Sequence, residues 1–377
     1  MHMRTDLQRY PLASVCMSAP TLPHRSRSAL SAIAATAVVV PVLLVACAAP
    51  VAQPPPTAPA VSDVADVSSA APASDPAAAS GPSSAAPRGT LVVHGTGDVN
   101  LDPAYIPALR TRGYAHAWAG LDGLFTGDDL TVVNLECPVS DRGTIVPKEF
   151  NFRCDPGALP AAKAAGVEVA NLANNHSGDF GPAALLDSVE RLRGSGIAPV
   201  GAGANVREAS TAAVVERNGW RIAVLGFGGV VPAADWLAGP NRPGMASGDD
   251  TESMTAAVRA AGEVADLVFV SIHWGVVLDT QPRADDVARA HAMIDAGADG
   301  GFGHQSHRLQ ALGSYKGRPI AWGLGNFVWP TLSEAGSRSA VAEFVVTPDG
   351  EVSGCLLPVR ITSPGHPELV GPRSCVT

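Results

Sequence analysis

The stretch that decides the fold covers residues 167–179 and reads VEVANLANNHSGD. Its first four residues have the apolar, β-branched pattern of a buried strand, and most of the next nine are the Asn, His, Ser, Gly and Asp of a polar loop. Apolar residues at helical spacing follow over residues 182–193. A strand, a polar loop and a helix in this order form the repeating unit of an α/β fold.

The same pattern extends along the chain on both sides of this stretch. Further strands are predicted at residues 91–93, 130–133, 221–225 and 267–272, and further helices at 251–261 and 283–296. After Gly300 the pattern changes to strand-like runs without helices, at residues 319–322, 340–346 and 351–359. The sequence therefore predicts an α/β sandwich without internal repeats.

The composition excludes nucleic acid as the main partner. The chain has 377 residues, of which 46% are hydrophobic and 16% charged, and its mean hydropathy is +0.15. Its formal charge is −9, and residues 1–46 contribute +3 through four Arg and one Asp, so the remainder carries −12. With only three lysines in the whole chain, this remainder lacks the basic stripe that nucleic-acid binding requires.

The N-terminal residues predict export. Basic residues at positions 24–27 precede an apolar run over 29–46, which ends in Leu-Val-Ala before Cys47. A charged segment, an apolar run and small residues are the three parts of a secretory signal. The run resembles a bacterial lipobox, in which Cys47 is lipidated and becomes the mature N-terminus; an uncleaved membrane anchor is the alternative. A start at Met1 or at Met17 leaves this signal intact, and both interpretations place the remaining chain outside the cytoplasm.

The next segment has the composition of a spacer. Residues 48–87 contain 14 Ala, 9 Pro and 7 Ser, and a segment without aromatic residues cannot offset its ordering entropy. The expected organisation is a lipoprotein signal peptide at 1–46, a disordered linker at 47–88, one folded domain at 89–360 and a C-terminal tail at 361–377.

Four cysteines remain outside the leader, and they can pair in three ways. An oxidising compartment and local pairing favour Cys137–Cys154, which closes the loop after Glu136, and Cys355–Cys375, which fastens the tail. Neither pair has CxxC spacing, which argues against a zinc knuckle.

Polar residues follow the ends of the predicted strands. In chain order these loops contain Gly97-Asp98-Val99-Asn100, Asn134-Leu135-Glu136, residues 171–179, His273-Trp274-Gly275, residues 303–307 and residues 323–327. Ligands of open α/β sheets bind at the carboxyl ends of strands, so the loops are expected to converge on one pocket. Carboxylate, amide and imidazole groups together favour Mn, Fe or Zn, and Glu136 is suited to bridge two ions about 3.5–4 Å apart.

Each motif alone has an ordinary explanation. Asp98 suits a helix cap, His273 a hydrogen-bonded core residue, and Asn174-Asn175 a simple turn. His304 and His307 can face one site only if the chain turns between them. The metal interpretation rests on the ordered set, because the ordinary explanations would all have to hold together at five strand ends.

The ordered set resembles a known family. Gly-Asp, Asn-Leu-Glu, Asn-Asn-His-Ser-x-Asp, His-Trp-Gly, Gly-His-x-x-His and Leu-Gly-Asn-Phe occur in the order typical of the CapA family, also called PgsA, of capsule and poly-γ-glutamate biosynthesis proteins. That family is similar in fold to calcineurin-like metallophosphoesterases, which implies two β-sheets flanked by helices. The resemblance covers about residues 91–346. It implies an anionic surface polymer or its phosphorylated precursor as partner, together with other polymer-synthesis proteins.

The resemblance also implies roles for single residues toward one or two divalent ions. Asp98 would ligate the first ion together with His307, and Glu136 would bridge the two. The implied ligands of the second ion are Asn175, His273 and His304. His176 corresponds to the histidine that protonates a leaving group, and Asp179 would orient His176 or contact substrate.

Three positions depart from the related pattern. Asn100, the remaining candidate ligand of the first ion, stands where the phosphoesterases have His, so that ion would be weakly held. Val276-Val277 stands where an acidic-aromatic pair is usual, and Ser306 where the family favours Pro. These differences bear on catalysis more than on the fold.

Two functions are therefore compared. One is a metal-dependent hydrolase with His176 as the acid; the other is a non-catalytic polymer-handling or export component with a vestigial metal site. A polyanion is an awkward ligand for so acidic a chain unless metals or nearby arginines neutralise it. The candidate arginines are Arg153, Arg242, Arg283 and Arg308. A solute-binding lipoprotein would fit the tether but not the His, Asp and Glu of the loops.

Overall fold

The computed structural model describes residues 87–330 and 333–376, which fall within one compact unit, Ala78–Thr377. The predicted signal peptide, the lipidation site Cys47 and all but the end of the predicted linker lie outside the described residues. Among the helices that the structure describes, none has the length and apolar character needed to cross a membrane.

Within the described residues, the larger sheet has nine strands. Its path runs through β16 (His366–Leu369), β15 (Val352–Ser363), β14 (Arg338–Val346), β1 (Leu91–Val99), β2 (Leu130–Leu135), β3 (Val167–Asn171) and β4 (Ala198–Val200). Two short strands complete it, β13 (Asn326–Val328) beside β1 and β17 (Ser374–Val376) beside β15. Strands β1 to β4 run parallel, so their carboxyl ends share one edge.

The smaller sheet, counted over the same described ranges, has six strands. Their order is β11 (Leu312–Tyr315), β12 (Arg318–Ala321), β10 (Gly300–His304), β9 (Leu267–His273), β7 (Trp220–Gly228) and β6 (Ala213–Arg217). The central strands β7, β9 and β10 are parallel. A separate pair is formed by β5 (Ala202–Gly203) and β8 (Gly244–Met245).

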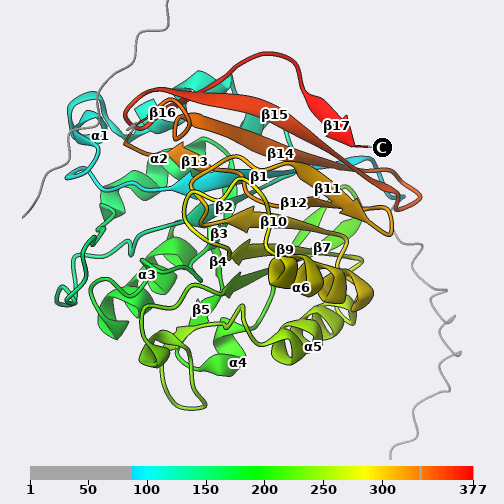
Figure 1. The fold of residues 1–377 in the computed structure, drawn as a ribbon, viewed down its shortest axis with the longest axis horizontal. Helices are drawn as coiled ribbons and strands as arrows, with labels where there is room; N and C mark the ends of the chain where they lie inside the picture. The colour runs from blue at the N-terminus through cyan, green and yellow to red at the C-terminus, as the bar shows by residue number, and fades with distance from the viewer. Residues whose placement is uncertain (1–86, 331–332, 377) are drawn as a thin grey trace, which may run out of the picture. The chain divides into compact units, whose positions relative to one another are not determined.

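The two sheets lie face to face over a shared apolar core (Figure 1). Phe302 of the smaller sheet stacks on Phe344 of the larger one with ring centroids 4.6 Å apart. A Cβ at Gly95 of β1 would lie 2.2 Å from the Phe302 ring, so only glycine permits this contact. Burial of this layer is the main source of stability for the sandwich.

Helices cover the outer faces of both sheets. The larger sheet packs against α1 (Pro107–Arg112), α2 (Leu159–Ala164) and α3 (Pro182–Gly194), and the smaller one against α5 (Thr251–Gly262) and α6 (Ala284–Asp295) (Figure 1). The remaining helical turns are α4 (Val206–Ala209), η1 (Tyr114–Ala117), η2 (Ala119–Leu121), η3 (Leu124–Thr126), η4 (Pro156–Ala158) and η5 (Ala234–Trp236). The predicted α/β sandwich, with two β-sheets flanked by helices, is confirmed.

The C-terminal residues differ from the expectation of a tail after residue 360. Strand β15 continues to Ser363, and β16 and β17 pair with it inside the larger sheet. Their short lengths and neighbouring Pro and Gly residues conceal these strands in the sequence. Disulfides join Cys355 to Cys375 across the β15–β17 pair and Cys137 to Cys154 beyond β2, which are the two pairings expected from the sequence.

Candidate metal centre

The predicted ligands come from neighbouring strands that end at the same edge. Asp98 of β1 lies in register with Asn134 of β2, and His273 of β9 lies in register with His304 of β10. Glu136 directly follows β2. Because the two sheets stack with these edges together, the ends of four strands bring their polar side chains into one buried cluster.

Short distances connect six of the predicted metal ligands. The structure brings together Asp98, Glu136, Asn175, His273, His304 and His307. His307 Nδ1 lies 3.0 Å from Asp98 Oδ2, and His304 Nδ1 lies 3.7 Å from Asp98 Oδ1. His273 Nε2 lies 2.8 Å from Asn175 Oδ1 and 3.7 Å from Glu136 Oε1. Ligand atoms of Asp98, Glu136 and His273 all lie within 4.8 Å of one another.

The cluster contains several buried atoms that have no hydrogen-bond partner. They are Asp98 Oδ2, both carboxylate oxygens of Glu136, His304 Nδ1 and His307 Nδ1. Buried polar atoms are normally satisfied because burying them unpaired costs free energy. A group of such atoms aimed at one another, made of carboxylate oxygens and imidazole nitrogens, fits a divalent ion of the Mn, Fe or Zn type.

Hydrogen bonds from outside the cluster hold the ligands in place. Asn134 Nδ2 lies 2.9 Å from Asp98 Oδ1 and 3.2 Å from His273 Nδ1, so it contacts a ligand from each sheet. The hydroxyl of Ser271 lies 3.0 Å from His304 Nε2, which turns the other ring nitrogen toward Asp98. Outer contacts of this kind orient the ligands of metal sites.

The turn that carries His304 and His307 has an unusual backbone. Gln305 has a φ of 87° and His307 a φ of 51°, both in the left-handed region that non-glycine residues rarely adopt. This turn directs both histidines toward Asp98, as the sequence required of a single site. The backbone of Leu278 fastens it by donating to Ser306 O at 2.8 Å.

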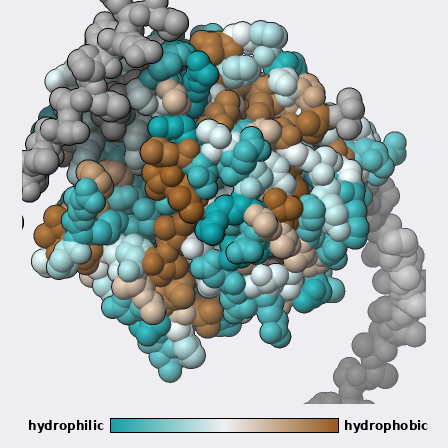
Figure 2. All heavy atoms as spheres, in the orientation of Figure 1, coloured by the Kyte–Doolittle hydropathy of each residue, from teal (hydrophilic) through white to brown (hydrophobic). Residues whose placement is uncertain are grey.

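Two of the positions that depart from the related pattern, Asn100 and Val276-Val277, can be located in the structure. The amide oxygen of Asn100 accepts a hydrogen bond from the backbone N–H of Asp102 at 2.8 Å, while its Nδ2 is buried without a partner. The oxygen that would serve the first ion is therefore engaged in a local turn. Val276 and Val277 are exposed apolar residues. As a separate observation, Figure 2 shows a narrow apolar band between hydrophilic areas on the face in view.

Electrostatics differ sharply among the ligands. Burial would raise the pKa of Asp98, but the close contact and positive charge of His307, whose Nδ1 lies 3.0 Å from Asp98 Oδ2, outweigh it and hold the pKa at about 2. Burial raises the pKa of Glu136 well above its ordinary value, and the charge of Asp98 adds to the rise. His307 is the balancing cation: burial would lower its pKa, yet Glu136 and Asp98 raise it to about 9.

The other two imidazoles of the cluster are neutral. Burial lowers the pKa of His273 to about 3 and that of His304 to about 4. A neutral imidazole keeps a lone pair on one nitrogen, which is the form that ligates metals. At pH 7, therefore, His273 and His304 are already in the metal-binding state.

The predicted acid His176 lies at the edge of the cluster. Its Nε2 is 3.9 Å from Glu136 Oε1, and its Nδ1 is 2.7 Å from Asp179 Oδ2. Phe152 stacks on the ring with centroids 4.0 Å apart, which limits water on that side. Burial lowers the pKa of His176 despite the hydrogen bond to Asp179.

Sequence reasoning missed Lys148 and underused two asparagines. Lys148 Nζ donates to the backbone oxygen of Asn175 and to Asp179, and it lies 3.1 Å from His176 Nδ1. Nothing in the irregular 141–150 segment marked this lysine. Asn134 and Asn326 belong to quoted motifs, and Asn326 Oδ1 is another buried atom without a partner.

These features define a class of protein: an α/β sandwich with a candidate divalent-metal centre at the carboxyl ends of its strands. The chain belongs to the bacterial capsule synthesis protein family PGA_cap, whose model matches residues 92–331. This confirms the family resemblance of the sequence motifs.

Individual relatives agree with that assignment. The capsule biosynthesis protein CapA of Bacillus anthracis is 32% identical over 281 residues, which cover 73% of this chain and 68% of the relative. A probable polyglutamine synthesis accessory protein of Mycobacterium tuberculosis is 36% identical over 214 residues, 54% of this chain. The match spans just over half, 56%, of the length of that mycobacterial relative.

Among solved structures, the chain is similar to the NAD nucleotidase of Haemophilus influenzae. The TM-score is 0.47 and the identity 11%, over 76% of this chain and 54% of that protein.

Proposed function

We propose that this protein is an extracytoplasmic, envelope-associated component of capsule or poly-γ-glutamate biosynthesis that carries a metal-dependent, phosphoesterase-like hydrolase site. The family assignment and the names of its relatives support the biological role. The hydrolase part rests on one observation, the buried cluster of Asp98, Glu136 and His273, in which the two carboxylates keep unpartnered oxygens. The proposed partner is an anionic surface polymer or its phosphorylated precursor.

The residues of the site have separate proposed roles. Asp98, Glu136, Asn175, His273, His304 and His307 would hold one or two divalent ions. A bound ion would supply Lewis-acid polarisation of the bond to be cleaved and of an attacking water. His176 is placed to protonate the leaving group from Nε2, while Asp179 fixes the ring through Nδ1. An anionic substrate beside His176 would raise its lowered pKa and so favour the protonated, acid form.

Lys148 adds positive charge on the substrate side of this arrangement. It holds Asp179 and the backbone of Asn175 at once, so it links the acid to a predicted ligand. Its side chain is partly exposed, with 19% accessible. It is therefore available to an anionic group of the substrate.

The test is a hydrolysis screen of the purified protein loaded with Mn²⁺, Fe²⁺ or Zn²⁺, against phosphomonoesters, phosphodiesters and poly-γ-glutamate. We expect turnover of one class, reduced about 100-fold or more in His176→Ala with metal binding intact. His273→Ala or His304→Ala should abolish binding of the tighter ion, and Asp98→Asn should lose mainly the looser one. Glu190→Ala, at an exposed position on α3, is the matched surface control.

A non-catalytic polymer-handling or export role is the second candidate. The observation that favours it is Asn100, whose oxygen is engaged with the Asp102 backbone and so weakens the first-ion side. Metal binding without hydrolysis of any of the three substrate classes would support this second role.

The membrane attachment is a separate proposal. We infer that Cys47 is lipidated and anchors the protein to the outer face of the cell membrane, because a basic segment, an apolar run and Leu-Val-Ala precede it. Cys47→Ala should release or mislocalise the protein. Unchanged membrane fractionation together with an unmodified N-terminus would contradict the anchor.

A further inference from the structure

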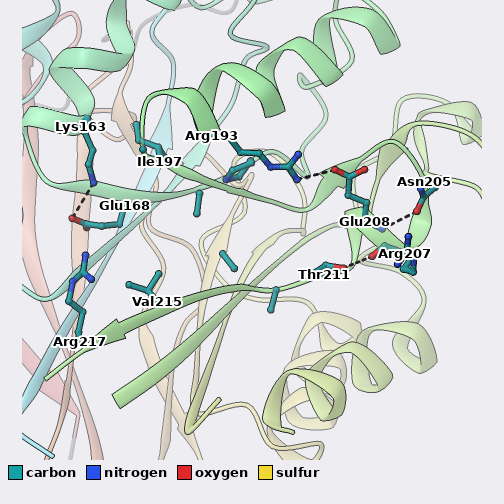
Figure 3. Close-up of a pocket in the computed structure, with 15 residues that line it drawn as sticks. Lys163, Glu168, Arg193, Ile197, Asn205, Arg207, Glu208, Thr211, Val215 and Arg217 are labelled. Atoms are coloured by element: carbon teal, nitrogen blue, oxygen red, sulfur yellow. Dashed lines mark hydrogen bonds and ion pairs between the residues drawn. The ribbon is translucent and has the colours of Figure 1, made fainter. Parts of the chain in front are cut away.

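A second cleft lies along the side of the sandwich, where the two sheets end. Its volume is about 610 Å³, within the range of ligand sites, and none of its lining residues belongs to the candidate metal centre. Strand β4 closes the larger sheet and β6 closes the smaller one, and the cleft lies between these two edge strands. Ile197 and Val215 lie along the middle of the cleft (Figure 3).

Charged residues gather at both ends of this cleft. Figure 3 shows Lys163, Glu168 and Arg217 at one end, and Arg193, Arg207 and Glu208 at the other. The cleft thus has four cations against two carboxylates, in a chain whose formal charge is −9. A local excess of positive charge on an acidic protein indicates an anionic ligand.

The two carboxylates are already occupied. Glu208 accepts from Arg193 and from the backbone N–H of Ala204, both at 2.9 Å. Glu168 accepts from the backbone N–H of Thr131 at 2.9 Å and lies 4.0 Å from Lys163. Each carboxylate therefore supports the local fold and neutralises one cation.

Within the described part of the chain, the other two cations, Arg207 and Arg217, are not neutralised by a carboxylate. Among the described residues, neither Arg207 nor Arg217 has a carboxylate within 4.0 Å; Arg217 donates only to the neighbouring backbone oxygen of Glu216. Of the four arginines expected near the motif loops, three, Arg153, Arg242 and Arg308, donate to backbone carbonyls. Arg207 and Arg217 therefore remain available to a ligand in the cleft.

The edge strand β4 disfavours an added strand. Pro199 lies in β4 and has no N–H to donate, and proline is a common protection of sheet edges. Recognition in the cleft is therefore left to side chains. Guanidinium groups suit carboxylates, which they bind through two parallel hydrogen bonds.

We propose that this cleft binds a stretch of a carboxylate-bearing polymer, with Arg207 and Arg217 each holding a carboxylate from one chain. The choice of a polycarboxylate rests on the proposed role in poly-γ-glutamate biosynthesis. Two contacts to one chain raise the effective affinity beyond that of either contact. A long polymer should therefore bind much more tightly than free glutamate.

The test measures binding of fluorescent poly-γ-glutamate to the purified protein at about 0.15 M salt, with unlabelled poly-γ-glutamate, polyphosphate and free glutamate as competitors. The double variant Arg207→Ser/Arg217→Ser should bind at least tenfold more weakly. The matched control Arg110→Ser/Arg259→Ser removes the same charge from exposed positions on α1 and α5 and should change affinity less than twofold. Unchanged melting temperatures establish that both variants fold.

Equal losses in the two double variants would overturn the proposal, because binding would then follow net charge alone. Competition by polyphosphate as strong as that by poly-γ-glutamate would overturn the carboxylate preference. This binding should persist in the presence of a chelator, because no lining residue of the cleft is a predicted metal ligand. The two proposals can therefore fail separately. Absence of hydrolysis would not affect the binding result for the cleft, and absence of polymer binding in the cleft would not affect the hydrolysis result.

Discussion

Strand β1 carries two buried polar clusters four residues apart, and they differ in how completely they are hydrogen-bonded. Around His94, the ring nitrogens lie 2.6 Å from Asp128 Oδ2 and 3.4 Å from Glu343 Oε2. Glu343 in turn pairs with Arg373 at 2.6 Å. Around Asp98, by contrast, carboxylate oxygens and imidazole nitrogens from the ends of β1, β2 and β10 converge without partners.

The comparison shows that burial and charge do not by themselves mark a functional site. Both clusters are buried and both mix histidine with carboxylates. The His94 cluster satisfies its own atoms and so stabilises the sandwich, whereas the Asp98 cluster keeps unpaired atoms that an ion would satisfy. The account therefore predicts opposite responses when each cluster is mutated.

The largest effect on stability is expected at the satisfied cluster. Asp128→Ala removes the partner of His94 and of the Thr131 hydroxyl, which donates to Asp128 at 2.6 Å. Breaking a buried pair costs about 3–5 kcal/mol of unfolding free energy, measured by urea denaturation with a chelator present. Glu190→Ala is the control. A loss below about 1 kcal/mol would show that the His94 cluster is not structural.

A smaller effect of opposite sign is expected at the unsatisfied cluster. Glu136 is fully buried with both oxygens unpartnered, so Glu136→Gln removes a charge that costs free energy to bury. The metal-free variant should be more stable than the metal-free wild type by about 1 kcal/mol, a typical size for such a change. It should also lose stabilisation by added metal. Destabilisation comparable to that of Asp128→Ala would remove the contrast between the clusters.

The smallest effect is a pH dependence from His94. Burial opposes protonation, but hydrogen bonds to Asp128 and Glu343 raise the pKa of His94 above 6.5 in the folded protein. Its contribution to stability is therefore fully present below pH 6.5 and is lost as pH rises through the raised pKa. The slope for one group cannot exceed about 1.4 kcal/mol per pH unit. Urea unfolding from pH 6 to 9 should show a steeper loss in the wild type than in His94→Gln, which keeps the contribution of His307; identical slopes would refute the prediction.

The sequence predicted the Asp98 cluster but not the His94 cluster. The ligands of the candidate metal centre follow strand ends, and strand ends of parallel sheets meet, so Asp98, Glu136 and His273 could be grouped without a structure. The partners of His94 are Asp128, 34 residues away in the segment before β2, and Glu343, 249 residues away on β14. No local pattern links such residues, and His94 itself reads as an ordinary strand position.

The cleft between β4 and β6 could not be predicted from the sequence, for the same reason. Strands β4 and β6 are short or half-exposed, and neither was predicted as a strand. Arg207 and Arg217 line one cleft only because these two strands end separate sheets that stack on each other. Pairing between sheets depends on tertiary packing, which single-sequence periodicity does not contain.

The most direct test of the central claim is calorimetric titration of Mn²⁺ and Zn²⁺ into the chelator-treated protein at pH 7.5. The account predicts at least one tightly bound ion per chain, a melting temperature that rises with metal concentration, and loss of both in His273→Ala. The same titration of Glu190→Ala should match the wild type. Absence of binding heat and of any shift in melting temperature with either ion would contradict a metal centre at Asp98, Glu136 and His273.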